Sequence, residues 1–278
     1  MQTLMLSFPR PGSAARLNSP KSGRFAEASA KALHVKTVAA FGGLIQYDVF
    51  FHKDVACRFR GKRFKTIVAL TERIFGRYRG LVYIMPCGVV VRAIAGLLEH
   101  KTTDPAVVVV DVGGRYAVSL LSGHEGGANA LALCVANALA AEPVISTTTE
   151  AARDVIVGVG CRRGARAADI VAAVRQGLRR AGVRPSRVRW LASADIKKGE
   201  AGLAAAAGEL GFGLRFISSV EIRSTAKAFR RSSFVNGKVK LPAVAEPAAL
   251  LAGRRTQLIL PKTIIRGVTV AVARENCL

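Results

Sequence analysis

Residues 106–111 read Ala-Val-Val-Val-Val-Asp, and this run constrains the fold of the chain more than any other feature. A continuous β-branched run of this length, closed by Gly113 and Gly114, is typical of a buried strand. Residues 81–85 form a second apolar run, and residues 89–98 place apolar side chains at helical spacing. Because half of the residues are hydrophobic and only 6% are aromatic, Ala, Val, Leu and Ile must build the core. These patterns favour an α/β fold.

The same alternation continues beyond the two glycines. They lead into a strand over residues 116–121, which we expect to form a hairpin with the preceding strand or a bulged continuation of it. An Ala/Leu-rich helix over residues 128–141 and a strand over residues 143–146 follow. We therefore predict a Rossmann-like α/β domain over residues 31–150.

A second α/β domain is predicted over residues 154–278. The chain of 278 residues is long enough for two domains that each bury a core. The complete chain is thus expected to form two α/β sandwich-type domains. The second contains strands predicted at 154–160, 188–193, 214–218, 258–260 and 268–272, and helices at 165–181, 200–210 and 246–251.

The first 26 residues contain no Asp or Glu but several Arg, Lys, Ser and Pro, which is typical of a transit peptide or a disordered tail. We interpret residues 1–30 as a poorly ordered terminus. No apolar run is long enough to cross a bilayer, and the five cysteines are odd in number and lack C-x-x-C spacing. We therefore expect a cytoplasmic protein without a membrane partner. The four dispersed histidines predict no metal site.

The net charge of +24 lies in the two ends of the sequence. Residues 76–153 carry 6 Lys and Arg against 6 Asp and Glu, whereas residues 154–278 carry 23 against 8. Such a field attracts nucleic acid, acidic lipid or a small ligand with many carboxylates, and it is also typical of a solvated arginine-rich surface. Because the basic segments lack interleaved aromatic residues, we do not expect nucleic acid as a partner.

A glycine-rich loop between a strand and a helix is the strongest candidate for a functional site. Its glycines let the backbone approach a ligand closely, and the N–H groups that start the helix favour an anion. His124 is a candidate general acid or base, with Ser122, Glu125 and Asn129 as its candidate partners. The alternative is that the glycines serve a tight turn and that His124 hydrogen-bonds the backbone. The loop glycines are Gly123, Gly126 and Gly127.

Four charged or small residues near other predicted strand ends are further candidates. A ligand carboxylate fits the helix start at Gly88, with Arg92 reaching it through two hydrogen bonds. Lys101 precedes the strand over residues 106–110, and Asp111 lies at its carboxyl end, where open sheets place ligand-contacting groups. For Lys101 and Asp111 a role in a cap or turn is the alternative.

The second domain offers three lower-ranked features. Residues 158–164 contain G-x-G without the third glycine of a dinucleotide loop, so we interpret them as a strand-end turn whose Arg162 and Arg163 face carboxylates. Glu246 and Lys262 are single charges near predicted element ends. We predict that both contact a ligand, and the alternative is a surface position.

The Ala-Val-Val-Val-Val-Asp run at residues 106–111, the glycine-rich loop within residues 119–129 and further ordered motifs of both predicted domains resemble one known family, the cobalt-precorrin-5A hydrolases (CbiG). The second half also resembles the CobE protein of the aerobic branch of cobalamin biosynthesis. Members of that family commonly carry a middle domain, for which this chain leaves no room between Thr149 and Asp154. The resemblance rests on residues 83–95, 101–111 and 119–129 for the N-terminal domain, and on 158–164, 192–197, 245–250, 261–263 and 267–273 for the C-terminal domain.

The resemblance implies an enzyme of anaerobic cobalamin biosynthesis that opens the ring A lactone of cobalt-precorrin-5A and releases acetaldehyde, giving cobalt-precorrin-5B. The expected partners are this substrate and neighbouring enzymes of the pathway. The cobalt arrives inside the substrate, so no cofactor and no protein metal site are expected. A non-catalytic carrier of corrinoid intermediates is the alternative.

This chemistry suggests roles for the candidate residues. It needs a base to activate water, donors for the developing oxyanion and cations for the carboxylate arms of the substrate. We assign acid–base catalysis to His124, assisted by Ser122 and Glu125, and the oxyanion or carboxylate cradle to the loop glycines. Predicted substrate contacts are Gly88, Arg92, Lys101, Asp111, Gly123, Gly126, Gly127, Asn129, Glu246 and Lys262.

Overall fold

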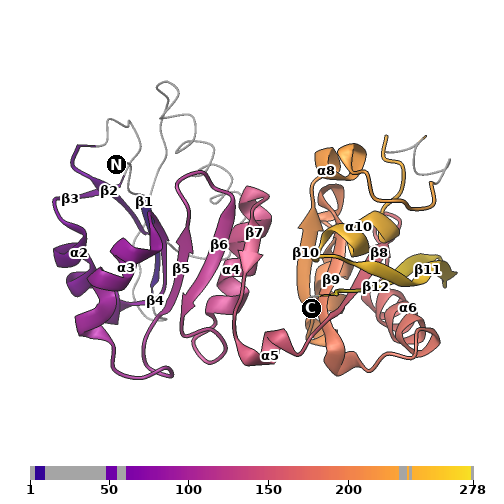
Figure 1. Ribbon diagram of the computed structural model, residues 1–278, viewed down its shortest axis with the longest axis horizontal. Coiled ribbons are helices and arrows are strands. Elements are labelled where there is room, and N and C mark those ends of the chain that lie inside the picture. Colours follow the sequence, from indigo (N-terminus) through magenta and orange to yellow (C-terminus); the bar gives the residue numbers. More distant parts are fainter. Residues whose placement is uncertain (1–3, 10–47, 55–60, 232–236, 238–239, 277–278) are drawn as a thin grey trace. The chain divides into compact units, whose positions relative to one another are not determined.

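The computed structural model describes residues 4–9, 48–54, 61–231, 237 and 240–276. The chain folds into two compact units, residues 1–147 and 148–278 (Figure 1). Each unit combines a sheet of parallel and antiparallel strands with helices, so the predicted α/β class is confirmed. Among the described residues, no helix is both long and apolar enough to cross a membrane.

The first unit is built on a seven-stranded sheet of order β3-β2-β1-β4-β5-β6-β7. β4 runs parallel to β5, whereas β6 runs antiparallel to β5 and parallel to β7. The hairpin predicted around the Gly113-Gly114 turn is therefore present. The strands are β1 (Leu4–Pro9), β2 (Asp48–His52), β3 (Lys62–Phe64), β4 (Tyr78–Ile84), β5 (Ala106–Val110), β6 (Tyr116–Leu121) and β7 (Glu142–Val144).

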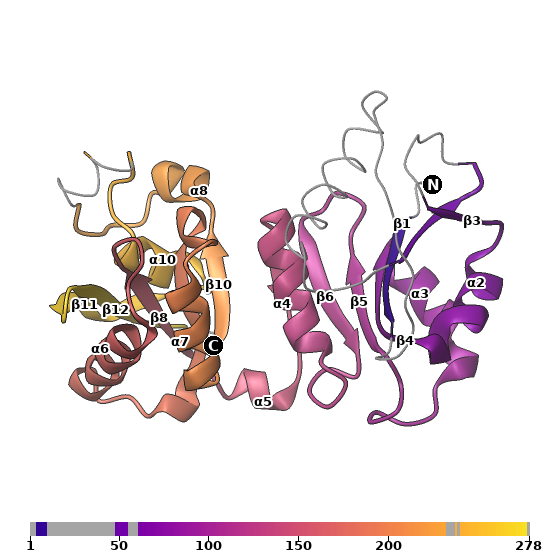
Figure 2. The same ribbon diagram turned by 180° about the vertical axis from the view of Figure 1, so that it is seen from behind.

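Helices cover both faces of this sheet, which Figure 2 shows from behind. Val107 and Val109 of β5 pack in a cluster with residues of α2 (Ile67–Ile74) and α3 (Cys87–Ile94). Val108 and Val110, which alternate with them, pack in a cluster with α4 (Ala128–Leu139). Because neither face of β5 meets water, every residue of this strand is apolar.

The expectation of a poorly ordered terminus over residues 1–30 is wrong for residues 4–9. They form β1, which pairs antiparallel with β2 on one side and with β4 on the other. Backbone hydrogen bonds to two neighbouring strands hold this segment in the sheet, and composition alone did not reveal that pairing. Residues 10–30 lie outside the described residues.

The second unit contains a five-stranded sheet of order β10-β9-β8-β12-β11. β8, β9 and β10 run parallel, and β12 pairs antiparallel with both β8 and β11. Three helices lie close to the ranges predicted at 165–181, 200–210 and 246–251, whereas the short helices over residues 148–151 and 219–224 were not predicted. The elements are α5 (Thr148–Ala151), β8 (Val155–Gly160), α6 (Ala167–Arg180), β9 (Val188–Ala194), α7 (Ala201–Leu210), β10 (Gly213–Ile217), α8 (Ser219–Ser224), α10 (Ala245–Leu251), β11 (Gln257–Ile265) and β12 (Val268–Arg274).

β11 is longer than the strand expected over residues 258–260, because it continues through Pro261 and Lys262. Its pairing with β12 shifts register between Leu258 and Leu260 and again between Leu260 and Thr263. β11 lies at the edge of the sheet, a position that tolerates a proline without a backbone N–H.

Gly158 lets α10 pack directly on β8. A Cβ atom at this position would lie 1.9 Å from the carbonyl oxygen of Ala245 and 2.9 Å from the Cβ atom of Ala249. Both of these residues belong to α10, on the face of the sheet opposite the cluster that joins β8 to α6 and α7. The absence of a side chain at Gly158 therefore fixes where α10 lies.

We predict that Gly158→Ala destabilises the protein by about 1–3 kcal/mol or more, since α10 must move away from β8. Urea unfolding monitored by circular dichroism measures the change. Gly208→Ala is the matched control, because Gly208 lies in α7 and an added Cβ meets nothing within 4 Å. That control is expected to be neutral or to stabilise by up to about 1 kcal/mol. Equal stability of the two variants would contradict the proposed packing constraint.

Candidate functional site: a cationic pocket in the second unit

A pocket of about 780 Å³ lies in the second unit, beside the carboxyl ends of β8 and β9. Open sheets commonly bind ligands at the carboxyl ends of their strands, because the loops that leave parallel strands surround a crevice there. The segment after β8 contributes Cys161, Arg162 and Arg163. The turn after β9 contributes Ile196 and Lys197.

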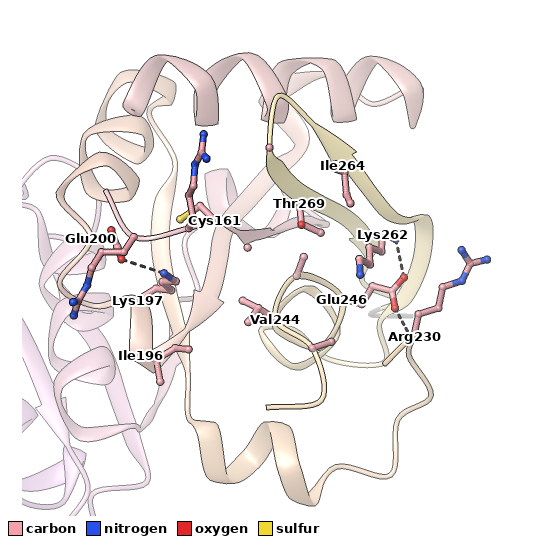
Figure 3. Close-up of a pocket in the computed structure, with 16 residues that line it drawn as sticks. Cys161, Ile196, Lys197, Glu200, Arg230, Val244, Glu246, Lys262, Ile264 and Thr269 are labelled. Carbon is pink, nitrogen blue, oxygen red and sulfur yellow. Dashed lines mark hydrogen bonds and ion pairs between the residues drawn. The ribbon is translucent and has the colours of Figure 1, made fainter. Parts of the chain in front are cut away.

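α10 and the β11–β12 hairpin complete the pocket. In Figure 3, Lys197 and Glu200 lie on one side, and Glu246 and Lys262 lie on the other. Val244 lies between these two groups. The remaining contributors include Arg230, Ala243, Ala245, Ile264, Gly267 and Thr269.

Glu200 organises the first side of the pocket. Its carboxylate accepts a hydrogen bond from the backbone N–H of Gly164 at 2.9 Å and one from Lys197 Nζ at 3.1 Å. These bonds, the one from Gly164 foremost, hold the pKa of Glu200 below its ordinary value. Gly202 lets the segment at Ala165 pack directly against the first turn of α7, because a Cβ atom at Gly202 would lie 2.0 Å from the carbonyl oxygen of Ala165. The start of α7 thus positions the loop that carries Arg162 and Arg163.

Glu246 organises the opposite side. Only 2% of this residue is exposed. One carboxylate oxygen accepts the backbone N–H of Arg230 at 2.6 Å, and the other accepts the backbone N–H of Lys262 at 2.7 Å. Glu246 is a predicted ligand contact and does line the pocket. Both of its oxygens already bind the protein backbone.

Cations outnumber carboxylates around the pocket. Arg162, Arg163, Lys197, Arg230 and Lys262 line it together with two carboxylates, and both carboxylates already accept hydrogen bonds from the backbone. The half-buried Lys262 amine makes no hydrogen bond or ion pair with any described residue. Such a lining fits a ligand that bears several carboxylates.

The pocket does not activate its cysteine. Burial, the largest effect, raises the pKa of the Cys161 thiol, which is therefore protonated at neutral pH. Among the described residues that line the pocket there is no histidine. No group of three His, Cys, Asp or Glu within the described part of the chain lies close enough to hold a metal ion. The lining thus favours ligand binding over nucleophilic chemistry by Cys161.

The predicted glycine-rich loop lies in the first unit and is tightly packed. A Cβ atom at Gly126 would lie 2.4 Å from the Cβ atom of Ser122, and one at Gly123 would lie 2.9 Å from Asn129 Oδ1. Ser122 adopts a positive φ of 56°, and Gly127 one of 86°. The glycines therefore allow the close turn before α4, and their predicted contact with a ligand stays a prediction.

The structure does not pair His124 with its predicted partners. His124 is exposed, Ser122 Oγ is buried without a hydrogen-bond partner among the described residues, and Glu125 binds Lys101 Nζ at 2.7 Å. That bond is the largest effect that lowers the pKa of Glu125. The Asn129 amide accepts a hydrogen bond from Ser119 and donates one to Thr147. The catalytic role of His124 stays a prediction.

Three other predicted contacts of the first unit, Gly88, Arg92 and Asp111, lie at the opposite end of the strands from the glycine-rich loop. Because β6 is antiparallel to β5, the loop after β6 lies beside the start of β5, whereas Asp111 follows its end. Asp111 accepts hydrogen bonds from the N–H groups of Gly113, Arg115 and Tyr116, and a bond from the Arg115 guanidinium, so it stabilises its own hairpin turn. Gly88 and Arg92 lie in α3, after the parallel strand β4, and are exposed. These residues do not gather around His124.

Two family models match the chain in sequence order. The model described as "Cobalamin synthesis G N-terminal" matches residues 69–150, and "Cobalamin synthesis G C-terminus" matches residues 155–273. Together they cover both units. The chain belongs to the cobalamin synthesis G family. Only residues 151–154 separate the matched segments, which leaves no room for a middle domain.

Several individual proteins are similar to parts of this member of the cobalamin synthesis G family. A cobalt-precorrin-5A hydrolase from Priestia megaterium is 47% identical over 94 residues, which are 34% of this chain and 25% of the relative. Protein CobE from Sinorhizobium sp. is 32% identical over 128 residues, 45% of this chain and 83% of the relative. A crystal structure of CobE is 29% identical and covers 44% of this chain and 90% of its own, with a TM-score of 0.41. The chain thus matches about a quarter of the hydrolase but most of CobE.

Several pocket residues of this family member were not predicted from the sequence. Lys197 and Glu200 follow the predicted strand over residues 188–193, and the strand-end rule applied to Asp111 points to them as well. No sequence signal marks Arg230 or Thr269, because the β11–β12 hairpin and the segment before residue 231 reach the pocket only through tertiary packing. Of the predicted contacts, Glu246 and Lys262 line the pocket.

Glu200→Gln tests the first side of the pocket. The pKa of Glu200 is lower in the folded than in the unfolded protein, so its carboxylate stabilises the fold above the ordinary pKa, and this contribution disappears as the pH falls through the lowered value. We expect the variant to be less stable than the unaltered protein at pH 7 and the difference to shrink in acid. Urea unfolding across pH measures it, with Glu209→Gln, an exposed carboxylate of α7, as control. A difference independent of pH would contradict this role.

Proposed function

We propose that this chain is a cobalt-precorrin-5A hydrolase that acts in the cytoplasm and binds carboxylate arms of its substrate in the pocket of the second unit. The observation that carries the proposal is the lining of that pocket, where cations surround two carboxylates that are already bound to the backbone. The name of the Priestia megaterium relative supports the choice of substrate. The cobalt ion is part of that substrate.

The pocket offers contacts of two kinds to such a molecule. Arg162, Arg163 and Lys262 can donate charge-assisted hydrogen bonds to acetate and propionate arms. Ile196 and Ile264 are 44% and 66% exposed, so their apolar side chains are open to the face of a macrocycle. Binding through the arms holds the macrocycle in one orientation, which lowers the entropic part of the barrier to reaction.

Lactone opening requires that water lose a proton as it adds to the carbonyl carbon and that the ring C–O bond then break. We retain His124 for the proton transfer, because its imidazole is exposed and histidine is the side chain most often used in general acid–base catalysis. The family resemblance implies that a two-carbon fragment then leaves as acetaldehyde. The pocket cations take no part in this bond breaking.

The complete chain incubated with cobalt-precorrin-5A is expected to release acetaldehyde, detected with a coupled alcohol dehydrogenase. His124→Ala should lower turnover by about 10²–10⁴-fold, the usual contribution of a general acid or base. His100→Ala is the control, because His100 is another exposed histidine of the same unit and bonds Thr102. Undiminished turnover of His124→Ala with an unchanged melting temperature would contradict the assignment.

A carrier that binds the intermediate without converting it is the second candidate function. It is favoured by the absence of histidine from the described pocket lining and by the engagement of both carboxylates there. The same assay separates the two functions. A carrier binds cobalt-precorrin-5A and yields no acetaldehyde.

Carboxylate binding is tested with uroporphyrin, a flat octacarboxylate tetrapyrrole, by fluorescence titration. Lys262→Met should weaken binding by about tenfold or more, the value of one hydrogen bond from a charged donor. The fold should be unaffected, because the Lys262 amine binds no described residue. Arg180→Met removes one positive charge from the exposed end of α6 and serves as control. Equal affinities of the two variants would contradict a direct contact with Lys262.

A further inference from the structure

Glu246 presents an electrostatic problem for an anion-binding pocket. It lines the pocket, yet a carboxylate repels the arms of the proposed ligand. A residue kept only for packing there would be better replaced by an apolar side chain, because burial of a charge costs free energy unless the charge is hydrogen-bonded. The contacts of Glu246 indicate what the charge does.

Each oxygen of Glu246 binds a different segment of the chain. Oε2 accepts the N–H of Arg230 at 2.6 Å, and Oε1 accepts the N–H of Lys262 at 2.7 Å. Both partners lie 16 residues away in sequence, one before and one after α10. One buried carboxylate thus ties two segments to the helix, and Figure 3 shows it between them. Neither oxygen faces a ligand as a free acceptor.

The backbone position of Lys262 depends on its hydrogen bond to Glu246, because β11 is irregular at that point. The pairing of β11 with β12 passes from Leu260 to Thr263, and the register shifts between these two residues. The pairing therefore does not fix the backbone of Lys262, and Pro261 beside it has no N–H to donate. The carboxylate of Glu246 supplies the acceptor that the neighbouring strand does not.

We infer that Glu246 is a positioning residue that sets the affinity of the pocket for polycarboxylates, by holding the backbone from which the Lys262 amine reaches the ligand. The inference rests on the proposed function, since it assumes that the pocket binds such a ligand. Glu246 itself does not touch the ligand. It acts through Lys262, whose backbone N–H it binds, and its bond to the Arg230 N–H holds the carboxylate itself in place.

The two possible effects of Glu246 have opposite signs. If it acted only as a charge in the lining, Glu246→Gln would remove a repulsion and tighten binding of an anion. If it positions Lys262, the same change replaces one acceptor oxygen by an NH₂ group that faces a backbone N–H, and binding weakens. The direction of the change therefore separates the two effects.

Fluorescence titration of the complete chain with uroporphyrin provides the test. Glu246→Gln is expected to weaken binding roughly tenfold, about the loss from removing the Lys262 contact itself. In the Lys262→Met background the same change should have little effect, because the residue through which it acts is gone. A merely structural role would give the same loss in both backgrounds. Glu209→Gln, an exposed carboxylate of the same unit, is the control.

Unchanged or tighter binding by Glu246→Gln, or an equal loss in both backgrounds, would overturn the role of Glu246. Failure of the unaltered protein to bind uroporphyrin would instead contradict the proposed function.

Arg230 supplies a second test that does not alter the buried carboxylate. Arg230→Ala and Arg230→Pro both remove the exposed guanidinium, but only proline removes the N–H that binds Glu246. We expect several-fold weaker binding by the proline variant. Equal binding by the two variants would argue against a role for the hydrogen bond between the Arg230 N–H and Glu246.

Discussion

Contact between β8 and α10 at Gly158 determines the geometry of the second unit. A Cβ atom there would overlap the carbonyl oxygen of Ala245, so the helix backbone lies directly on the strand. α10 carries Glu246 in its first turn, and the close approach brings this carboxylate within reach of two backbone N–H groups. The position of Lys262 at the pocket thus depends, through Glu246, on the missing side chain of Gly158. A glycine in a strand interior often marks such an approach of another backbone.

The first unit illustrates how strand direction separates residues that are close in sequence. The loop after β6 and the turn that contains Asp111 are about ten residues apart. They nevertheless lie at opposite ends of the strands, because β6 runs antiparallel to β5. Asp111 is occupied by its own hairpin, and Lys101 by Glu125. In the second unit the neighbouring strands β8, β9 and β10 are parallel, so the segments that follow β8 and β9 lie together at the carboxyl ends of the strands. A cationic pocket forms there without long excursions of the chain.

Much of the fold could be predicted because apolar periodicity is a local property. The runs over residues 106–110 and 155–160 are buried on both faces, and their composition reflects this directly. Gly158 was noticed in the sequence only as part of a turn, because the atom that excludes its side chain belongs to a residue 87 positions later. β1 was missed for a similar reason, since its partners β2 and β4 are distant in sequence. Arg163 lies near enough to Glu200 to help lower the pKa of that carboxyl, because Glu200 follows the adjacent strand, whereas the expectation for Arg162 stays a prediction.

The irregular segment of β11 also bears on how the protein avoids unwanted association. β11 is the outermost strand of its sheet, and an outermost strand normally offers a row of free backbone groups to another chain. Here Pro261 interrupts the donors, the register shifts on either side of Leu260, and the N–H of Lys262 turns inward to Glu246. A second molecule therefore finds no regular ladder to extend. The hydrogen bond that holds a pocket lysine in place also helps to keep this edge resistant to aggregation.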